Sequence, residues 1–501
     1  MRALLAASAA AAAAAAPASA TISLPSRTPV NTVGVTYASS NIDPSCNRGF
    51  HSTNFSNPNL IAAAAALAPL RLRFGGSGAD NLVFSPAPGA PECAAIPSPP
   101  ASCDYVTPGC LNASHWERLY HLANASGAEF IFGVSYDLEA ACAAGAAYDW
   151  AAGPAAANAA RLLDYLAAHG QRLYGFEVGN EINNVGGAPC LQTPAAQASA
   201  MAAFAALAAR SAPSARLVGP DSGYRDAQAW DAALLPLLPA GALHAVTHHV
   251  YNGVSRKDWT SAAQLDSILP EVAWYVATAR AGAPGAQIWA GENGPIGGGD
   301  DGTCGTASVC GTYASSIWYA DDMALRAKYG FHHHQRQDLF GGAYGLTASL
   351  SGAMALGADE ALALTPDFWL AFVFKRTLGA SILNATSSSR DVRAYAYAGA
   401  PPSRFAAPEC AASPLQLRLI NLSENATVAA LPAGVASSAA WTLAAGAGGP
   451  FARGVTLNGV ALPGVVDAAH RDFLGAITAP AARGGAAVTL APQSTTFVCT
   501  A

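Results

Sequence analysis

Short apolar runs alternate with longer alanine- and leucine-rich stretches along the chain up to about residue 380. Eight of these runs predict β-strands, and several of the stretches between them repeat apolar residues at helical spacing. The predicted strands are VGVTYAS (33–39), LRLRFGG (70–76), EFIFGVS (129–135), YGFEVGNE (174–181), ARLVGPD (215–221), AVTHHVY (245–251), AQIWAGE (286–292) and FHHHQRQ (331–337). The clearest helices are 158–170, which ends on a helix-stopping glycine, and 366–379. Strands that alternate with helices pair in parallel, so the pattern predicts an α/β fold, a (β/α)8 TIM barrel over 33–379. An open doubly wound sheet is the alternative.

The pattern changes at two places. Residues 85–110 are rich in proline and cysteine, which predicts an irregular loop held by disulfides and inserted after the second strand. After about residue 380 the apolar runs become short, alternate with polar residues and are separated by Gly, Pro and Asn turns. We therefore expect a C-terminal antiparallel β-sandwich over 380–501.

The N-terminus has the layout of a secretory signal. One arginine precedes a short apolar stretch and the small residues Ala18-Ser19-Ala20, which predicts cleavage after residue 20 and removal of residues 1–20. An uncleaved anchor is the alternative. No later segment has about 18 uninterrupted strongly apolar residues, so no transmembrane span is expected after cleavage. A secreted, extracellular protein follows, with the lysosome or vacuole as the alternative destination.

Cysteines and glycosylation triplets agree with the secretory route. The chain has ten cysteines, an even number. We expect a local bridge between Cys304 and Cys310 and a C-terminal bridge between Cys410 and Cys499, while the other pairings stay open. The N-x-S/T triplets begin at Asn54, Asn112, Asn124, Asn384, Asn421 and Asn425.

The charge balance restricts the partners. Net charge is −6, and the only lysines are Lys257, Lys328 and Lys375. Proteins that grip nucleic acid or a highly sulfated polymer usually carry basic clusters. We therefore expect neither nucleic acid nor a densely sulfated glycan as the partner.

Two glutamates close predicted strands of the barrel. Glu181 ends the fourth strand and Glu292 ends the seventh, each after an apolar run and a glycine or asparagine. Active sites of such barrels lie at the C-terminal ends of the strands, so the two carboxylates face each other across the mouth. Glycoside hydrolysis uses such a pair, one as proton donor and one as nucleophile or base. Either glutamate alone has a plain alternative as a helix cap or an ion-pair partner.

An ordered set of motifs resembles glycoside hydrolase family 79, the family of the heparanases and β-glucuronidases. The similarity runs along most of the chain that follows the signal. The matching segments are LRFGGSGADNLVF (72–84), FEVGNEINN (176–184), IWAGENGPIGGG (288–299), HHHQRQDLFGGAYGL (332–346) and PDFWLAFVFKRTLG (366–379). The resemblance also implies that part of residues 21–32 adds a strand to the sandwich.

The resemblance implies roles for individual residues. Glu181 is expected to be the acid/base, starting protonated, and Glu292 the ionised nucleophile. Asn180 is expected to bond the sugar 2-hydroxyl. Asp80 is expected to bind sugar hydroxyls, with a loop cap as its alternative, and Gln337 belongs to the same substrate-binding set.

Recognition of glucuronic acid requires a site for its carboxylate. The resemblance implies that backbone N–H groups of the glycine run Gly297, Gly298 and Gly299 and the hydroxyl of Tyr344 supply it. Consecutive free N–H groups form an anion-binding concavity. A flexible loop is the alternative for the glycines, because glycine clusters mostly mark loops.

Histidines near the predicted site raise two further possibilities. In THHVYN (247–252), Tyr251 is expected to hydrogen-bond Glu292, while the strand register decides which histidine points inward. The run HHH (332–334) does not predict a metal site, since alternate strand residues face opposite ways. GGGDDG (297–302) lacks the ligand spacing of a calcium loop. We expect neither a metal nor an organic cofactor.

The hypothesis from sequence is a secreted retaining β-glucuronidase that acts on glycans or proteoglycans containing glucuronic acid or its 4-O-methyl form. One alternative is a heparanase-like endo-β-glucuronidase that acts on a glycosaminoglycan. Three lysines and a net charge of −6 argue against heparan sulfate as the substrate. A non-catalytic glycan-binding member of the family is another. A retaining enzyme of different sugar specificity is the third.

Overall fold

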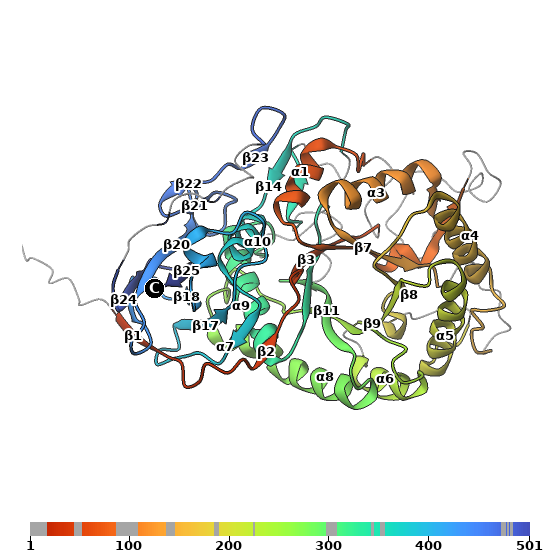
Figure 1. Ribbon diagram of the computed structural model, residues 1–501, viewed down its shortest axis with the longest axis horizontal. Helices are drawn as coiled ribbons and strands as arrows, with labels where there is room; N and C mark the ends of the chain where they lie inside the picture. Colours follow the sequence, from red (N-terminus) through yellow and green to blue (C-terminus); the bar gives the residue numbers. More distant parts are fainter. Residues whose placement is uncertain are drawn as a thin grey trace, which may run out of the picture.

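Eight parallel strands close into a barrel, and a β-sandwich lies beside it (Figure 1). The computed structural model describes residues 18–44, 53–86, 109–136, 146–184, 190–223, 226–296, 308–341, 345–350, 356–471, 477, 480 and 484–501. The barrel strands are, in order around the sheet, β10 (Ala245–Tyr251), β11 (Gln287–Gly294), β12 (His333–Arg336), β3 (Ala38–Ile42), β4 (Arg71–Phe74), β7 (Glu129–Val134), β8 (Gly175–Val178) and β9 (Arg216–Ser222). The predicted TIM barrel with a β-sandwich is confirmed.

Helices cover the outside of the barrel (Figure 1). They are α1 (Pro58–Ala66), α3 (Ala113–Ser126), α4 (Pro154–His169), α5 (Pro194–Ser211), α6 (Ala227–Leu234), α8 (Leu269–Gly282), α9 (Tyr313–Tyr329) and α10 (Pro366–Thr377). The predicted stop after α4 is present, because Gly170 adopts a φ of +64° that residues with side chains rarely take. Among the described residues, no helix is both long and apolar enough to cross a membrane.

The first barrel strand lies further along the chain than predicted. It spans Ala38–Ile42, whereas the apolar run at 33–39 begins too early. The reason is that the centre of the strand is polar and buried, with the residues Ser39, Ser40 and Asn41. The Ser40 hydroxyl, for example, donates to the Arg336 carbonyl at 2.8 Å. Internal hydrogen bonds offset the desolvation cost of these groups, so hydrophobicity does not mark the strand.

Two sheets form the sandwich. The larger contains β2 (Asn31–Thr32), β15 (Ser381–Leu383), β17 (Val392–Ala398), β18 (Gln416–Asn421), β25 (Ser494–Thr500), β20 (Ser437–Ala445), β21 (Val455–Leu457) and β22 (Val460–Ala461). The smaller contains β16 (Thr386–Ser387), β1 (Ala18–Ser23), β19 (Thr427–Ala430) and β24 (Ala487–Leu490). Apolar side chains of both sheets, such as Ile22, Leu417 and Leu490, pack into one core. The N-terminal strand β1 thus lies in the C-terminal domain, where β19 pairs with it in parallel (Figure 1).

One short sheet and one helix join the two domains. Strands β13 (Thr347–Ser349) and β14 (Leu362–Leu364) pair with β23 (Val465–Val466), while β5 (Leu82–Ser85) and β6 (Gly109–Asn112) pair beside the barrel. Every residue of α10 is buried, because this helix lies between the barrel and the sandwich. A disulfide between Cys410 of the short helix α11 (Pro408–Ala411) and Cys499 of β25 confirms the predicted C-terminal bridge.

Candidate active site

Arg73 lies at the centre of a buried ion-pair network inside the barrel. Its side chain comes from β4 and is fully shielded from solvent. The guanidinium donates to Glu177 Oε2 at 2.6 Å, to Asp221 Oδ2 at 2.8 Å and to Glu292 Oε2 at 3.1 Å. It also donates to Asn180 Oδ1 at 2.8 Å. One arginine therefore fixes side chains from β8, β9 and β11.

The two innermost carboxyl groups of this network have opposite proton affinities. Burial raises the pKa of Glu177 well above its ordinary value, and the Arg73 charge only partly opposes this. Burial also acts on Asp221, but Arg73 and His249 outweigh it and hold the pKa of that carboxyl well below its usual range. Within this hydrogen-bonded pair the proton therefore favours Glu177, while Asp221 keeps the negative charge.

The two predicted catalytic glutamates face each other at the mouth of the barrel. Glu181 directly follows β8, and Glu292 lies within β11. A carboxylate oxygen of each lies within 4.8 Å of the other, and His249 Nδ1 lies 2.9 Å from Glu181 Oε1 and 3.8 Å from Glu292 Oε2. The Glu181 side chain is 21% exposed and that of Glu292 is 8% exposed, so Glu181 lies nearer to solvent. Glu181 also has a φ of +49°, a conformation that costs a side-chain-bearing residue roughly 1–2 kcal/mol.

His249 joins the carboxylates of the site. Its Nδ1 lies 2.9 Å from Glu181 Oε1, and its Nε2 lies 3.3 Å from Asp221 Oδ1. Burial on its own lowers the pKa of His249. The carboxylates of Glu292 and Asp221, together with hydrogen bonds to Asp221 and Glu181, outweigh burial and raise this pKa to about 10. His249 is therefore an imidazolium at neutral pH.

The charge on His249 changes the protonation expected for Glu181. Burial raises the pKa of Glu181, but the hydrogen bond and positive charge of His249, assisted by Asn184, lower it overall. These contacts favour the ionised form of Glu181 in the free protein, and the expectation that Glu181 is protonated when the reaction starts stays a prediction. The proton lies on His249, because a fully buried imidazole among several carboxylates is the stronger base.

The pKa of His249 predicts a measurable pH dependence of stability. The folded value of about 10 exceeds the unfolded value of about 6.5, so the native state holds one more proton between these pH values. The stabilisation is complete below about pH 6.5 and is lost as pH rises through about 10, by at most about 5 kcal/mol. We expect urea unfolding to show that the difference in unfolding free energy between wild type and His249→Gln narrows from pH 6 to pH 10. A gap of constant size would contradict a charged His249.

Neighbouring polar groups hold both glutamates in place. The Tyr251 hydroxyl donates to Glu292 Oε1, the contact expected from the sequence. Asn184 Nδ2 donates to Glu181 Oε2 at 2.8 Å. Each of the two carboxylates is therefore held by groups on more than one side, which fixes its position.

Asp80 and Asn180 bond each other. Asp80 lies in a 3₁₀ turn at Ser77–Asn81, and its carboxylate accepts the Asn180 backbone N–H at 3.0 and 3.1 Å. Asn180 in turn donates from Nδ2 to Ser77 Oγ at 3.3 Å. The cap-like contact considered for Asp80 is thus present, and it positions the residue before Glu181.

The two glycines after Arg73 make room for charged side chains. A Cβ on Gly75 would lie 2.7 Å from the Arg73 guanidinium carbon, and a Cβ on Gly76 would overlap the Asp43 carboxylate. Gln337 contacts that same carboxylate, donating from Nε2 at 2.6 Å, and it has no exposed area. Gln337 therefore holds Asp43 rather than reaching the open face, which differs from the expectation of a direct sugar contact.

Several predicted residues lie outside the described part of the chain. They are Gly297, Gly298, Gly299, Tyr344 and Cys304. Cys310 is described and is disulfide-bonded, as are Cys110 and Cys190.

The glycosylation candidates differ in accessibility. Asn124 and Asn425 are exposed, and Asn54, Asn112 and Asn384 are half-buried. Asn421 is buried, and its Nδ2 donates to the Asn425 and Ala491 carbonyls at 2.8 and 2.9 Å. The folded protein therefore cannot carry a glycan on Asn421, and that expectation is wrong.

Glu181, His249 and Glu292 lie close enough together to surround a metal ion. A doubly protonated imidazole has two donors and no lone pair to offer, however. The raised pKa of His249 thus favours an ion-pair network over metal ligation at neutral pH.

Sequence reasoning did not assign Arg73, Asp221 or His249. The run LRLRF offers a signal for Arg73. Alternate residues share one face of a strand, so the arginines of this run lie on the face opposite to Leu72 and Phe74. For His249 the sequence did not give the strand register, which decides which histidine points into the barrel. His248 points outward to Glu271 at 2.8 Å, and a register shift between the two histidines turns His249 inward.

Comparison with known proteins agrees with this geometry. The model of the N-terminal domain of glycosyl hydrolase family 79 matches residues 44–324. Heparanase-like protein 2 of Arabidopsis thaliana is 26% identical over 385 residues, which cover 75% of this chain and 66% of that protein. Heparanase of Gallus gallus is 27% identical over 421 residues, 75% of each chain. The chain thus spans just under two thirds of the length of the plant relative.

Solved structures share the fold at low sequence identity. A GH51 arabinofuranosidase from Xanthomonas axonopodis pv. citri has a TM-score of 0.65 at 12% identity, covering 96% of this chain and 100% of its own. A 4-O-α-L-rhamnosyl-β-D-glucuronidase from Fusarium oxysporum has a TM-score of 0.62 at 13% identity, with 96% and 100% covered.

Proposed function

This chain belongs to glycoside hydrolase family 79, and from that premise we propose that it hydrolyses β-linked glucuronic acid, or its 4-O-methyl form, with retention at the anomeric carbon. The observation that carries the proposal is the separation of Glu181 and Glu292, whose carboxylate oxygens approach within 4.8 Å. Retaining enzymes hold their two carboxyl groups roughly 5–5.5 Å apart, whereas inverting enzymes need roughly 6.5–9.5 Å to admit a water.

The first half of the reaction transfers the sugar to the protein. Glu292 attacks the anomeric carbon while Glu181 gives a proton to the departing glycosidic oxygen, so the C1–O bond breaks and an ester forms. Arg73 and Tyr251 hold Glu292 for this attack. Glu181, now ionised, then takes a proton from water, which attacks C1 and releases the sugar.

Glu181 has to gain its proton when the substrate binds. In the free protein the His249 imidazolium keeps Glu181 ionised. A bound sugar displaces water from Glu181 and a glucuronate adds negative charge nearby, and both changes raise a carboxyl pKa. Activity is therefore expected at mildly acidic pH and to decline as pH rises.

Three observations favour glucuronic acid as the sugar. The family resemblance assigns carboxylate recognition to Gly297, Gly298, Gly299 and Tyr344. The relatives matched are heparanases and heparanase-like proteins. A structure with the same barrel-based fold is named a β-D-glucuronidase.

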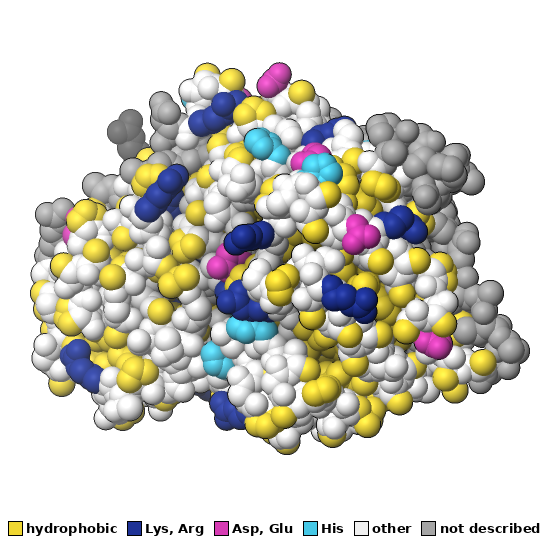
Figure 2. Space-filling view, turned by 45° about the vertical axis from the view of Figure 1, so that its right-hand side comes forward, with side chains coloured by type: hydrophobic (Ala, Val, Ile, Leu, Met, Phe, Trp, Pro, Cys, Tyr) yellow, Lys and Arg dark blue, Asp and Glu magenta, His cyan; other side chains and the backbone are white. Residues whose placement is uncertain are grey.

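A heparanase-like endo-acting enzyme is the second candidate, favoured by the names of the relatives. Net charge of −6 and three lysines weigh against a densely sulfated substrate. In Figure 2 the Lys and Arg side chains on the face shown lie singly or in small groups among neutral and apolar surface. A terminal glucuronic acid on a weakly charged glycan is therefore the preferred substrate.

Passage through the secretory route is part of the proposal. The signal-like N-terminus and the N-x-S/T triplets support it. The bridge between Cys410 and Cys499 and the disulfide-bonded Cys110, Cys190 and Cys310 also support it, since structural disulfides persist in oxidising compartments.

The test compares hydrolysis of nitrophenyl β-D-glucuronide, β-D-glucoside and α-L-arabinofuranoside at pH 5, with proton NMR of the first-formed sugar. We expect turnover of the glucuronide alone, with the β-anomer released first. Release of the α-anomer would contradict retention, and turnover of the glucoside or arabinofuranoside alone would contradict the sugar assignment.

A further inference from the structure

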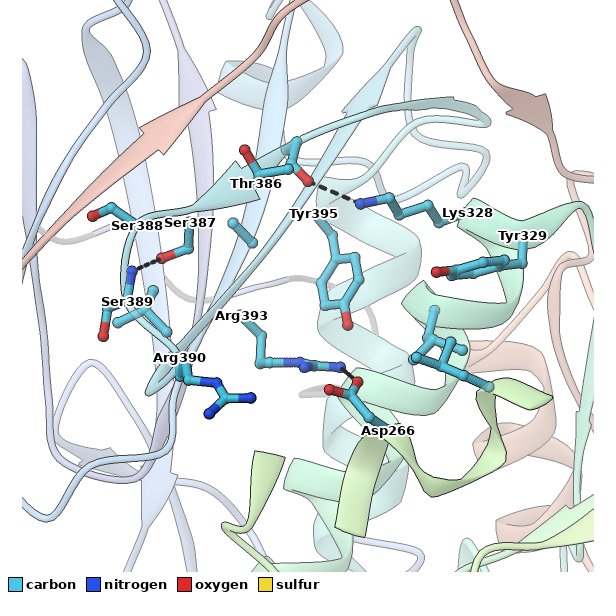
Figure 3. Close-up of a pocket in the computed structure, with 15 residues that line it drawn as sticks. Asp266, Lys328, Tyr329, Thr386, Ser387, Ser388, Ser389, Arg390, Arg393 and Tyr395 are labelled. Atoms are coloured by element: carbon cyan, nitrogen blue, oxygen red, sulfur yellow. Dashed lines mark hydrogen bonds and ion pairs between the residues drawn. The ribbon is translucent and has the colours of Figure 1, made fainter. Parts of the chain in front are cut away.

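A cleft of about 320 Å³ lies between the outside of the barrel and the sandwich (Figure 3). One wall comes from the last turn of α9 and the start of α8, and the other from β16, β17 and the loop between them. Its volume is at the lower end of the range of small-molecule sites, roughly 300–1,000 Å³. The catalytic side chains project inside the barrel, so the cleft is a separate location.

The cleft has an excess of positive charge. Lys328, Arg390 and Arg393 line it, and Asp266 is the one acid among the described lining residues. Arg393 is already engaged, by Asp266 at 2.6 Å and by the buried Asp321 beneath it at 2.9 Å. Lys328 and Arg390 have no carboxylate partner among the described residues, in a chain whose net charge is −6.

The two unmatched cations have their charges available to a ligand. Among the described residues, Lys328 Nζ donates to the Ala385 carbonyl alone, at 3.1 Å, which leaves its other N–H donors for a ligand. Arg390 is exposed and makes no hydrogen bond or ion pair with a described residue. In Figure 3 the Arg390 side chain extends into the opening beside Arg393. An arginine so placed can bind a carboxylate through two parallel N–H bonds.

Neutral groups in the cleft are those that bind sugars. Thr386, Ser387, Ser388 and Ser389 line the sandwich wall, and the three serine hydroxyls accept the backbone N–H groups of Ser389, Thr21 and Asp391 while keeping their own O–H donors. On the opposite wall Tyr329 is 44% exposed, a large ring with a polar tip. Hydroxyls satisfy the hydroxyl groups of a sugar, and an exposed ring covers its apolar face.

We propose that this cleft is a second glycan site, which holds a carboxylate-bearing sugar unit of the polymer whose glucuronic acid is hydrolysed in the barrel. The identity of the polymer rests on the proposed function, while binding in the cleft does not. Sulfate groups share the anionic chemistry, but Lys328 and Arg390 provide two unmatched charges, which suits a sparsely charged uronic acid polymer better than a densely sulfated one.

The test is affinity electrophoresis of the full protein in gels that contain a glucuronic-acid-bearing arabinogalactan. We expect the polymer to retard wild type and the double variant Lys328→Gln/Arg390→Gln to bind roughly tenfold more weakly, the size of one to two lost charge-assisted contacts. Arg390→Gln alone, at an exposed position, should lose part of the binding. The matched control is Arg172→Gln/Arg210→Gln, which removes two exposed charges, one just after α4 and one in the last turn of α5, and should bind as wild type does.

Further arms separate the possible ligands from one another and from the catalytic proposal. The carboxyl-reduced polymer should not retard wild type, and retardation by dextran sulfate alone would overturn the uronic acid assignment. Turnover of nitrophenyl β-D-glucuronide should be unchanged in the double variant. Equal binding by the double variant and wild type overturns the cleft proposal even if the glucuronide is hydrolysed. If the glucuronide is not hydrolysed but the binding loss persists, the catalytic proposal fails and the cleft proposal holds.

Discussion

Glu292→Gly will lose turnover of nitrophenyl β-D-glucuronide by about 10⁴-fold or more, the scale on which enzymes lose activity without their nucleophile. The shortened side chain leaves space on the face from which Glu292 attacks. Azide entering that space will form a bond to C1 as nitrophenolate leaves, so an α-glucuronyl azide is expected. Its detection by mass spectrometry and proton NMR measures which face of the sugar Glu292 occupies.

The matching change at Glu181 gives the opposite product. In Glu181→Ala the nitrophenolate still departs, because it is a good leaving group that needs no proton. The glycosyl ester on Glu292 is then hydrolysed roughly 10²–10⁴-fold more slowly than in wild type, because no base activates the water. Azide then attacks the ester from the other face and gives the β-azide. Exposed Glu424 in the sandwich serves as control, since Glu424→Gln should keep wild-type turnover. The same azide anomer from both variants would mean that the roles of the two glutamates are not those proposed.

Much of the barrel follows from sequence because its strands are buried on both faces. Mainly apolar runs marked six of the strands, and a glutamate at the end of two of these runs marked the predicted catalytic pair, whereas β12 is buried but polar. Periodicity of this kind depends on each residue's own hydrophobicity. It therefore succeeds wherever burial is achieved by apolar side chains.

The rest depends on pairings that a single sequence does not show. The first strand is buried through hydrogen bonds of Ser39, Ser40 and Asn41, each with a partner far along the chain or across the barrel. The proton on His249 likewise depends on carboxylates contributed by other strands. The sequence therefore gives the place of Glu181 in the site but not the effect of His249 on its pKa in the free protein.

Arg73→Met will destabilise the protein by about 3–5 kcal/mol at neutral pH, because it leaves buried carboxylates without their cation. Methionine fills much of the arginine volume, so loss of packing is a small part of the effect. Activity should also fall by about 10²-fold or more, since Glu292 and Asn180 both lose a fixed hydrogen bond. Urea unfolding and glucuronide turnover measure the two effects separately.

The pH dependence separates charge from packing in this result. Arg73 helps to hold the pKa of Asp221 well below its usual range, so this part of the stability exists above the unfolded pKa of about 3.9 and is lost as pH falls through the lower folded value. Without Arg73 the pKa of Asp221 rises, and the variant takes up a proton at mildly acidic pH. The difference in unfolding free energy between wild type and Arg73→Met should therefore narrow from pH 7 to pH 4.

Arg418 is the matched control: it is fully buried and donates to the Tyr397 hydroxyl at 2.6 Å, with no carboxylate ion pair among the described residues. Arg418→Met should therefore keep activity, and its loss of unfolding free energy relative to wild type should not change with pH. If the loss for Arg73→Met is also independent of pH, packing rather than charge explains it.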